Sequence, residues 1–517
     1  MRILIIFLLA ASANAGSEIA ATVKTESGLV SGGGTGVRVY RGIPYAAAPV
    51  GPLRWRPPAP PPHWQGVRRS IEFGPACPQA VSLTLAGANL PKQSEDCLTL
   101  NIWTPALHAN QRLPVLVSIH GGGFVAGAAS LDVYDGEGFA RQGLVFVSVN
   151  YRLGVFGFLA HPALANESPH HASGNYGLMD QIAALRWIQR NIAAFGGDSR
   201  RVTIFGESAG GSSVCYLLVS PLAKGLFHGA ISQSAQGIYL PMKTAVGEDL
   251  GVDIAALRAI GAQELLKKVS QSGSAAAGVQ FQPVVDGWVL PDDPAALFDA
   301  GKMNGVPVIA GTNTDDAVAM LLLTGASIRT IAAYRDYLTS RFGEAAGRAL
   351  ELYPANSDVE SRRMLRQLIT DLNFRFGARS VLFAMARRNR AYWYQFTRFD
   401  PVSRKLGTSG PMHGAEMGYV FGDLKKSLFT GTPFLPGRPE GFDDTDRALA
   451  KAMNGAWVQF VKTGDPNGPD LPNWPLVRAS DPQFLEYGDT IQAGKATREP
   501  QMRFLTEYFQ RLRQSPK

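Results

Sequence analysis

The sequence predicts an α/β fold in which a large, mostly parallel sheet carries helices on both faces. Short apolar runs typical of buried strands, such as residues 113–119 and 306–311, alternate with helix-prone stretches such as residues 176–195. This alternation favours parallel pairing, because each helical crossover returns the chain to the same end of the sheet. The motifs described below spread over most of the chain. We therefore expect one large domain over residues 16–517 rather than two or three.

The first 15 residues have the pattern of a secretory signal peptide. Arg2 precedes an apolar run over residues 3–10, and residues 13–15 read Ala-Asn-Ala, a small-residue cleavage site. The apolar run is too short to span a bilayer. We expect the rest of the chain to be exported to the periplasm or out of the cell, with no stable membrane anchor.

A glycine-rich loop follows the predicted strand at residues 113–119. Residues 120–124 read His-Gly-Gly-Gly-Phe. Glycine has no Cβ, so successive glycines let backbone amides approach an oxygen atom closely. The amides of Gly122 and Gly123, together with that of Ala209, can stabilise an oxyanion. A phosphate-binding loop is a poorer interpretation, because no Lys-Ser/Thr pair follows.

A second apolar run, beginning at Val202, ends in Gly-Glu-Ser-Ala-Gly at residues 206–210, and a helix-prone stretch comes next. Strand, tight turn and helix form the context in which Gly-x-Ser-x-Gly exposes a nucleophilic serine. Ser208 is at the apex, with the helix N-terminus directed at the reacting oxygen. Gly206 and Gly210 leave room for the neighbouring strand and helix.

A nucleophilic serine needs a general base, and in the fold that uses this turn the chain order is serine, acid, histidine. Only His228 and His413 follow Ser208. His228 leaves little room for an acid-bearing strand between itself and Ser208. His413 lies in a loop flanked by glycine, proline and serine, tethered at both ends as a general base requires. We therefore assign the base to His413.

The acid is expected after a core strand, about midway between the serine and the histidine. The strand predicted at residues 306–311 is followed by Asp315 and Asp316. Only one of two adjacent aspartates can orient an imidazole, because their side chains diverge. Asp286 is the alternative, although its Asp-Gly pair is more typical of a turn. The residues themselves leave the choice between Asp315 and Asp316 open.

These features are joined by further motifs along the chain: YRGIPYA at 40–46, SEDCLTLNIWTP at 94–105, LDVY at 131–134, NYRLGVFGFL at 150–159, GNYGLMDQ at 174–181 and FGGDS at 195–199. With them, nearly everything after the first twenty residues resembles the type-B carboxylesterases, the family that includes cholinesterases and some fungal lipases. The resemblance implies an α/β-hydrolase fold and a triad of Ser208, Asp316 and His413. It also implies carboxylic ester hydrolysis through an acyl-enzyme, with no cofactor and no metal.

The sequence departs from the family at the acid. The family usually has Asp-Glu-Gly where this chain reads Asp315-Asp316-Ala317. Because the Asp316 side chain is one methylene shorter, the histidine loop must lie slightly closer to it. The resemblance further implies a disulfide between Cys77 and Cys97. It implies two buried ion pairs that serve folding, namely Arg41 with Glu95 and Arg152 with Asp180.

The resemblance also indicates which residues surround the substrate. Glu207, beside the nucleophile, corresponds to a carboxylate near the site, and Ser234 to a support for the histidine–acid pair. Phe124 closes the glycine loop on the substrate side. The substrate-pocket positions that are aromatic in the family fall on Ala277, Val279 and Met320. Small or flexible side chains there predict a roomy, apolar pocket for bulky or medium-length acyl groups.

Composition narrows the function further. The formal net charge is +8, but the basic residues are scattered, which disfavours nucleic-acid binding. Cys215 is expected to be a buried free thiol, and no Cys/His cluster suggests a metal site. Residues 78–96 contain no Trp, Tyr or Phe that could bind a quaternary ammonium group, so a cholinesterase is disfavoured.

The sequence thus predicts a hydrolase of small-molecule aryl or alkyl esters, of unknown oligomeric state. The alternatives are an amidase, a carbamate hydrolase or a specialised detoxifying esterase. A non-catalytic binding module of the same fold is a further alternative, although this chain keeps both its serine and its histidine.

Overall fold

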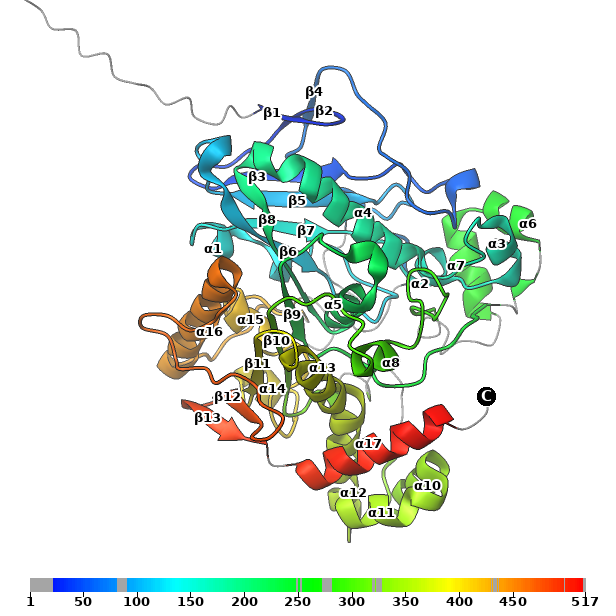
Figure 1. The fold of residues 1–517 in the computed structure, drawn as a ribbon, viewed down its shortest axis with the longest axis vertical. Coiled ribbons are helices and arrows are strands. Elements are labelled where there is room, and N and C mark those ends of the chain that lie inside the picture. The colour runs from blue at the N-terminus through cyan, green and yellow to red at the C-terminus, as the bar shows by residue number, and fades with distance from the viewer. Residues whose placement is uncertain are drawn as a thin grey trace, which may run out of the picture.

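The computed structural model describes residues 22–80, 91–247, 250–251, 253–271, 281–318, 321, 328–428, 430, 435, 437–496 and 498–514. Within this part of the chain, a ten-stranded sheet runs through the centre of the molecule (Figure 1). Its strands, from one edge to the other, are β13 (Ile491–Lys495), β12 (Gln483–Tyr487), β11 (Ala391–Phe396), β10 (Val308–Asn313), β9 (Gly229–Gln233), β8 (Gly197–Glu207), β6 (Leu113–Ile119), β7 (Val145–Val149), β5 (Thr99–Thr104) and β3 (Arg38–Pro44).

The sheet is parallel across its middle. The strands from β12 through β7 pair in parallel, and the antiparallel pairs β12·β13, β5·β7 and β3·β5 lie toward the two edges. A separate small sheet contains β1 (Thr22–Thr25), β2 (Gly28–Ser31) and β4 (Val67–Arg69). The predicted α/β architecture is confirmed, and the carboxyl ends of β6, β8 and β10 reach the same end of the sheet, where ligands bind in such folds.

Helices cover both faces of the sheet (Figure 1). They are α1 (Glu137–Ala140), α2 (Gly154–Phe158), α3 (Pro162–Glu167), α4 (Tyr176–Asn191), α5 (Ala209–Val219), α6 (Ile254–Ala259), α7 (Ala262–Gln271), α8 (Pro294–Asp299), α10 (Ile331–Phe342), α11 (Ala346–Leu352), α12 (Asp358–Thr370), α13 (Phe376–Ala386), α14 (Pro401–Lys405), α15 (Met417–Val420), α16 (Asp444–Thr463) and α17 (Glu499–Gln514). A π-helical turn, Asp371–Arg375, joins α12 to α13.

The alternation of side chains along the strands produces two apolar cores. On β6, Val115 and Val117 pack into the core beneath α4 and α5, whereas Leu116 packs into the core beneath α1, α15 and α16. Successive residues of a strand point to opposite faces, so a sheet covered on both sides has strands that are apolar throughout. This is why the strand at residues 113–119 reads as a continuous apolar run.

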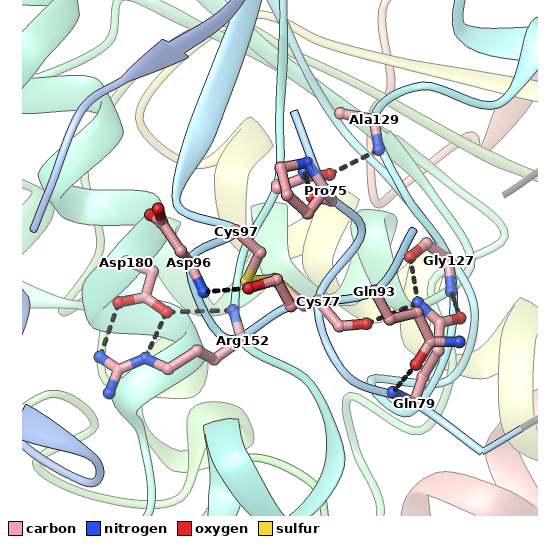
Figure 2. The surroundings of a disulfide bond; sticks show 12 residues. Pro75, Cys77, Gln79, Gln93, Asp96, Cys97, Gly127, Ala129, Arg152 and Asp180 are labelled. Atoms are coloured by element: carbon pink, nitrogen blue, oxygen red, sulfur yellow. Dashed lines mark hydrogen bonds and ion pairs between the residues drawn. A yellow bond between two sulfur atoms is a disulfide. The ribbon is translucent and has the colours of Figure 1, made fainter. Parts of the chain in front are cut away.

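One of the two predicted ion pairs is wrong. Arg152 and Asp180 form a buried, two-bond pair, as expected (Figure 2). Glu95, however, pairs with Arg54, whose guanidinium donates two hydrogen bonds to it. Arg41 instead donates to the carbonyl of Ile71 and lies over the ring of Phe73. The side chain of Arg54 is 4 % exposed and also donates to the carbonyl groups of Leu257 in α6 and Ile260 directly after it, contacts that local sequence does not reveal.

Candidate active site

Ser208 lies in a strained turn between β8 and α5. Its φ is +59° and its ψ is −125°, a combination that L-residues rarely adopt. A Cβ on Gly206 would lie 2.4 Å from the carbonyl carbon of Gly210, and one on Gly210 would lie 2.1 Å from the carbonyl oxygen of Ile119. The turn is fixed from the next strand, because the Ser208 amide donates to the Gln233 carbonyl at 2.9 Å. The predicted strand–turn–helix geometry is confirmed, and it needs both glycines.

The imidazole of His413 is held by Asp316. Its Nδ1 lies 2.8 Å from Asp316 Oδ1. The other carboxylate oxygen of Asp316 accepts hydrogen bonds from the Ser234 hydroxyl at 3.1 Å and from the Asn313 amide at 2.8 Å. Asp316 is fully buried, so these contacts fix its orientation. The structure therefore brings together His413, Asp316 and Ser234, as the sequence predicts.

The other candidates for acid and base lie elsewhere. Asp315 points away from the histidine, because its carboxylate pairs with Arg366 and accepts from the Ser409 amide at 2.8 Å. Asp286 accepts from the amides of Trp288 and Leu290 and so closes the turn that its sequence indicates. His228 precedes β9, where Nδ1 accepts a long hydrogen bond from the amide of Val202.

Glu207 lies against the second nitrogen of the imidazole. Its Oε1 is 3.2 Å from His413 Nε2, but the two atoms are not aligned for a hydrogen bond, and neither oxygen of Glu207 has a hydrogen-bond partner among the described residues. Within those residues the hydroxyl of Ser208 makes no hydrogen bond either. Nε2 therefore lies close to a carboxyl group and makes no hydrogen bond to the serine hydroxyl in this arrangement.

A further carboxyl group, Glu416, completes the buried cluster. It accepts hydrogen bonds from the side-chain amides of Gln233 at 2.9 Å and Asn313 at 2.6 Å. Glu416 was not predicted from the sequence. The available signal was its position three residues after His413, in the same loop.

Charge and burial act against each other in this cluster. Burial raises the pKa of Glu207 to about 8, because a carboxylate there would lack water. Burial opposes protonation of His413, but the surrounding carboxyl groups outweigh it, with Glu207 and Asp316 contributing most, and raise the pKa of His413 to about 9. The site thus favours an imidazolium, which is the charge that a histidine acquires when it accepts a proton from serine.

The glycine loop packs directly on this turn. A Cβ on Gly121 would lie 2.8 Å from the Glu207 carbonyl oxygen and 3.2 Å from Ser208 Cβ. Gly122 and Gly123 have φ values of +108° and +64°, in the region that favours glycine. In the described part of the chain, the amides of Gly122, Gly123 and Ala209 donate no hydrogen bond. These three donors remain available for a ligand oxygen.

The side chains of Gln79 and Asn150 connect the residues that follow the glycine loop to the segment around Cys77. Gln79 donates to the Gly127 carbonyl and accepts from the Gly127 amide, both at 2.9 Å (Figure 2). Asn150 accepts from the Ala129 amide at 2.8 Å and donates to the Pro75 carbonyl at 3.0 Å. The disulfide between Cys77 and Cys97 is present, as expected. Cys215 is a buried free thiol, also as expected.

A cavity of 190 Å³ opens beside Phe124, next to the glycine loop. Its lining combines apolar side chains, including Tyr216, Leu240 and Met242, with the polar side chains of Gln236, Lys243 and Gln282. Phe124 thus lies where the sequence places a substrate contact. Ala277, Val279 and Met320 lie outside the described residues.

The described residues contain no group of three or more His, Cys, Asp or Glu side chains arranged to bind a metal ion. No helix in the described part of the chain is long and apolar enough to cross a bilayer.

Comparison with known proteins agrees with the motifs. A sequence model of the carboxylesterase family matches residues 20–505. The fumonisin B1 esterase of Sphingopyxis macrogoltabida is 40 % identical over 481 residues, which cover 91 % of this chain and 87 % of that protein. The para-nitrobenzyl esterase of Bacillus subtilis is 36 % identical, with 90 % and 94 % covered.

The fold agrees as well. The crystal structure of the carboxylesterase EST55 of Geobacillus stearothermophilus matches with a TM-score of 0.79 at 34 % identity, covering 94 % of this chain and 100 % of that one. The α/β-hydrolase fold implied by the sequence is confirmed, and the non-catalytic alternative is set aside. The chain belongs to the carboxylesterase family and is a carboxylic ester hydrolase.

Proposed function

We propose that Ser208 is the nucleophile of this esterase, with His413 as its general base and Asp316 as the residue that orients the base. The observation that carries the proposal is the 2.8 Å contact between His413 Nδ1 and Asp316 Oδ1, beside a serine held in the strained turn. Asp316 fixes the tautomer of the ring, so that Nε2 is the nitrogen free to accept a proton.

The reaction proceeds in two steps. Ser208 Oγ attacks the ester carbonyl while its proton passes to His413 Nε2, and the same proton then leaves with the alcohol as the tetrahedral intermediate collapses to an acyl-enzyme. Water next attacks the acyl-enzyme with His413 again as base, which releases the acid and restores the serine. The first step requires a hydrogen bond between Nε2 and the serine hydroxyl, which is not formed among the described residues. Catalytic hydrogen bonds are often formed only when substrate is bound.

The oxyanion of each tetrahedral intermediate lies among the amides of Gly122, Gly123 and Ala209. This assignment is supported by the unused amides and by the packing of Gly121 on Ser208. Loss of one such donor typically costs about 10²–10³-fold in rate.

The cavity beside Phe124 supports a proposal about the substrate class. The apolar side chains in its lining favour aryl and alkyl esters with medium-length or bulky acyl groups. The described residues around Ser208 include no metal-binding cluster, and the proposed chemistry needs no cofactor.

We also propose that the enzyme is exported by the signal peptide at residues 1–15. The disulfide between Cys77 and Cys97 supports this location, because such bonds form in oxidising compartments. N-terminal sequencing of protein recovered from the periplasm or medium tests it, with Gly16 as the expected first residue.

A substrate panel tests the proposed specificity. Wild-type enzyme is assayed on p-nitrophenyl esters from acetate to octanoate, and on matched p-nitroanilides and carbamates, with Ser208→Ala as the blank. We expect the highest kcat/KM on medium-length esters. A preference for the anilide or the carbamate would replace the ester assignment, and loss of activity beyond acetate would contradict the roomy pocket.

A further inference from the structure

One continuous helical segment contacts both the acid loop and the histidine. It consists of α12, the π-helical turn Asp371–Arg375 and α13. Arg366, Thr370 and Phe374 recur every four residues along it. Side chains at this spacing share one helix face.

Each of these three side chains contacts a different part of the site. Arg366 pairs with Asp315, immediately before the proposed triad acid. The Thr370 hydroxyl accepts from the Ala317 amide at 3.1 Å, immediately after that acid. The helical segment therefore binds the acid loop at the residue before Asp316 and at the residue after it.

The third contact is with the base itself. The ring of Phe374 packs on the imidazole of His413, with 5.0 Å between centroids and 50° between planes. Phe374 is fully buried, so it excludes water from that side of the imidazole. One residue earlier, the Asn373 carbonyl accepts from the Gly237 amide at 2.7 Å, which fastens the segment to the loop that carries Ser234.

The π-helical turn is anchored from its other side. Asp371, fully buried, accepts hydrogen bonds from the Tyr353 hydroxyl at 3.0 Å and from Arg498 Nε at 2.7 Å. It also pairs with Arg375 within the turn. Arg498 immediately precedes α17, so the turn is held between the active site and the C-terminal helix. π-helical turns are rare and are frequently found at functional sites.

We infer that the π-helical turn Asp371–Arg375 is a positioning element of the esterase, which acts by pressing Phe374 against the imidazole of His413. The inference rests on the proposed role of His413 as base. Phe374 restricts the ring to the plane that Asp316 selects and limits how far Nε2 moves relative to the Ser208 hydroxyl.

The test compares Phe374→Leu with Phe376→Leu on a p-nitrophenyl ester. Phe376 is the matched control, since it lies on the same segment and is buried, but packs on Tyr239 and Phe509 instead of the histidine. We expect Phe374→Leu to lower kcat about 10–100-fold, as small misplacements of reacting groups do, with KM changed less than about twofold. We expect Phe376→Leu to lower thermal stability without lowering kcat per folded molecule.

The pH profile separates positioning from general destabilisation. The charged groups facing His413 are Glu207 at the end of β8, Asp316 in the acid loop and Glu416 in its own loop. Water admitted by Phe374→Leu would reduce the desolvation of the imidazolium, so the acidic limb of kcat/KM should move to higher pH. A structural role alone would leave that limb in place.

A second variant covers the case in which Phe374→Leu does not fold. Arg498→Gln removes an anchor of the turn from outside the core, and we expect it to lower kcat in the same direction and to be non-additive with Phe374→Leu. If Phe374→Leu and Arg498→Gln both match Phe376→Leu in kcat, KM and pH profile, the inference is overturned. Failure of the proposed function would show differently, as undiminished activity in Ser208→Ala.

Discussion

Asp315 and Asp316 are neighbours in sequence, yet their carboxylates point in different directions and hold different partners. Asp316 holds the imidazole of His413 at 2.8 Å, whereas Asp315 pairs with Arg366 on α12. Asp315 forms an isolated bridge to Met412, and Asp316 lies in the turn that follows, where its side chain takes a different direction. One aspartate therefore serves the proposed triad and the other fastens the loop that carries it.

Asp315→Asn should lower the stability of the protein while leaving most of its activity. It removes one charge of a mostly buried pair, and hydrogen bonds to charged groups contribute about 1.5–3 kcal/mol. We expect the free energy of unfolding to fall by about that amount, measured by urea denaturation, while most of the esterase activity at 25 °C remains. A loss of activity larger than the loss of folded protein would show that Asp315 has a role in the reaction.

Glu207→Gln should change the pH dependence of the reaction. Glu207 is one of the carboxyl groups that raise the pKa of His413 to about 9, and it lies 3.2 Å from Nε2. Removing this negative neighbour disfavours the imidazolium and so lowers the pKa of His413. Because the base must be neutral, the acidic limb of kcat/KM should move to lower pH.

The control for this experiment is Glu264→Gln, a substitution on the surface helix α7. It should leave the profile unchanged. An acidic limb in Glu207→Gln that coincides with the wild-type limb would show that Glu207 does not influence the base.

Gln79→Leu should slow the reaction without changing substrate affinity. Gln79 makes two hydrogen bonds to Gly127 and thereby holds the loop that presents the amides of Gly122 and Gly123 (Figure 2). Loss of an oxyanion donor costs about 10²–10³-fold in kcat, and displacement of the loop should cost less than that. Steady-state kinetics on a p-nitrophenyl ester measure this effect.

The neighbouring Gln93 provides a comparison. Its side-chain oxygen accepts a hydrogen bond from the backbone amide of Gln79, but among the described residues Gln93 does not bond to the glycine loop itself. Gln93→Leu should reduce kcat less than Gln79→Leu. Equal effects in the two variants would mean that Gln79 supports folding rather than the loop.

Replacing both Cys77 and Cys97 by serine should destabilise the fold more than it affects chemistry. The disulfide closes a loop with a sequence separation of 20, for which chain entropy gives about 3 kcal/mol. Urea denaturation of the double variant against wild type measures the difference. A midpoint unchanged from wild type would show that the hydrogen bonds of Gln79 and Asn150 hold this segment without the bond.

The parts of the site that sequence predicts are those built from local chain. The turn at Ser208 and the glycine loop each follow a strand, and their glycines are required by contacts within a few ångströms. The ends of α16 are likewise local, because the Asp443 side chain caps its first turn and Gly464, in the left-handed region, ends it. Contacts between residues far apart in the sequence could not be predicted as well. Glu95 pairs with Arg54 rather than Arg41. Arg54 is also held by the carbonyl groups of Leu257 and Ile260, about 200 residues later in the chain.

The residues that hold His413 in place are equally hard to predict where they come from distant parts of the chain. Phe374 reaches His413 from a helix about 40 residues earlier in the chain, through a π-helical turn that has no sequence signal. Ser234, by contrast, was expected from the family resemblance, and its hydroxyl does donate to Asp316. The prediction of a roomy pocket at Ala277, Val279 and Met320 stays a prediction, because those residues lie outside the described part of the chain.

The most direct test of the account compares kcat/KM on p-nitrophenyl butyrate for Ser208→Ala, Asp316→Asn and Asp315→Asn, each corrected for folded protein. The account predicts that activity is abolished in Ser208→Ala, falls by about 10⁴-fold in Asp316→Asn, as for other triad acids, and largely remains in Asp315→Asn. Substantial activity in Asp316→Asn together with its loss in Asp315→Asn would contradict the assignment of the acid, and with it the central claim that the contact between His413 and Asp316 forms the catalytic pair.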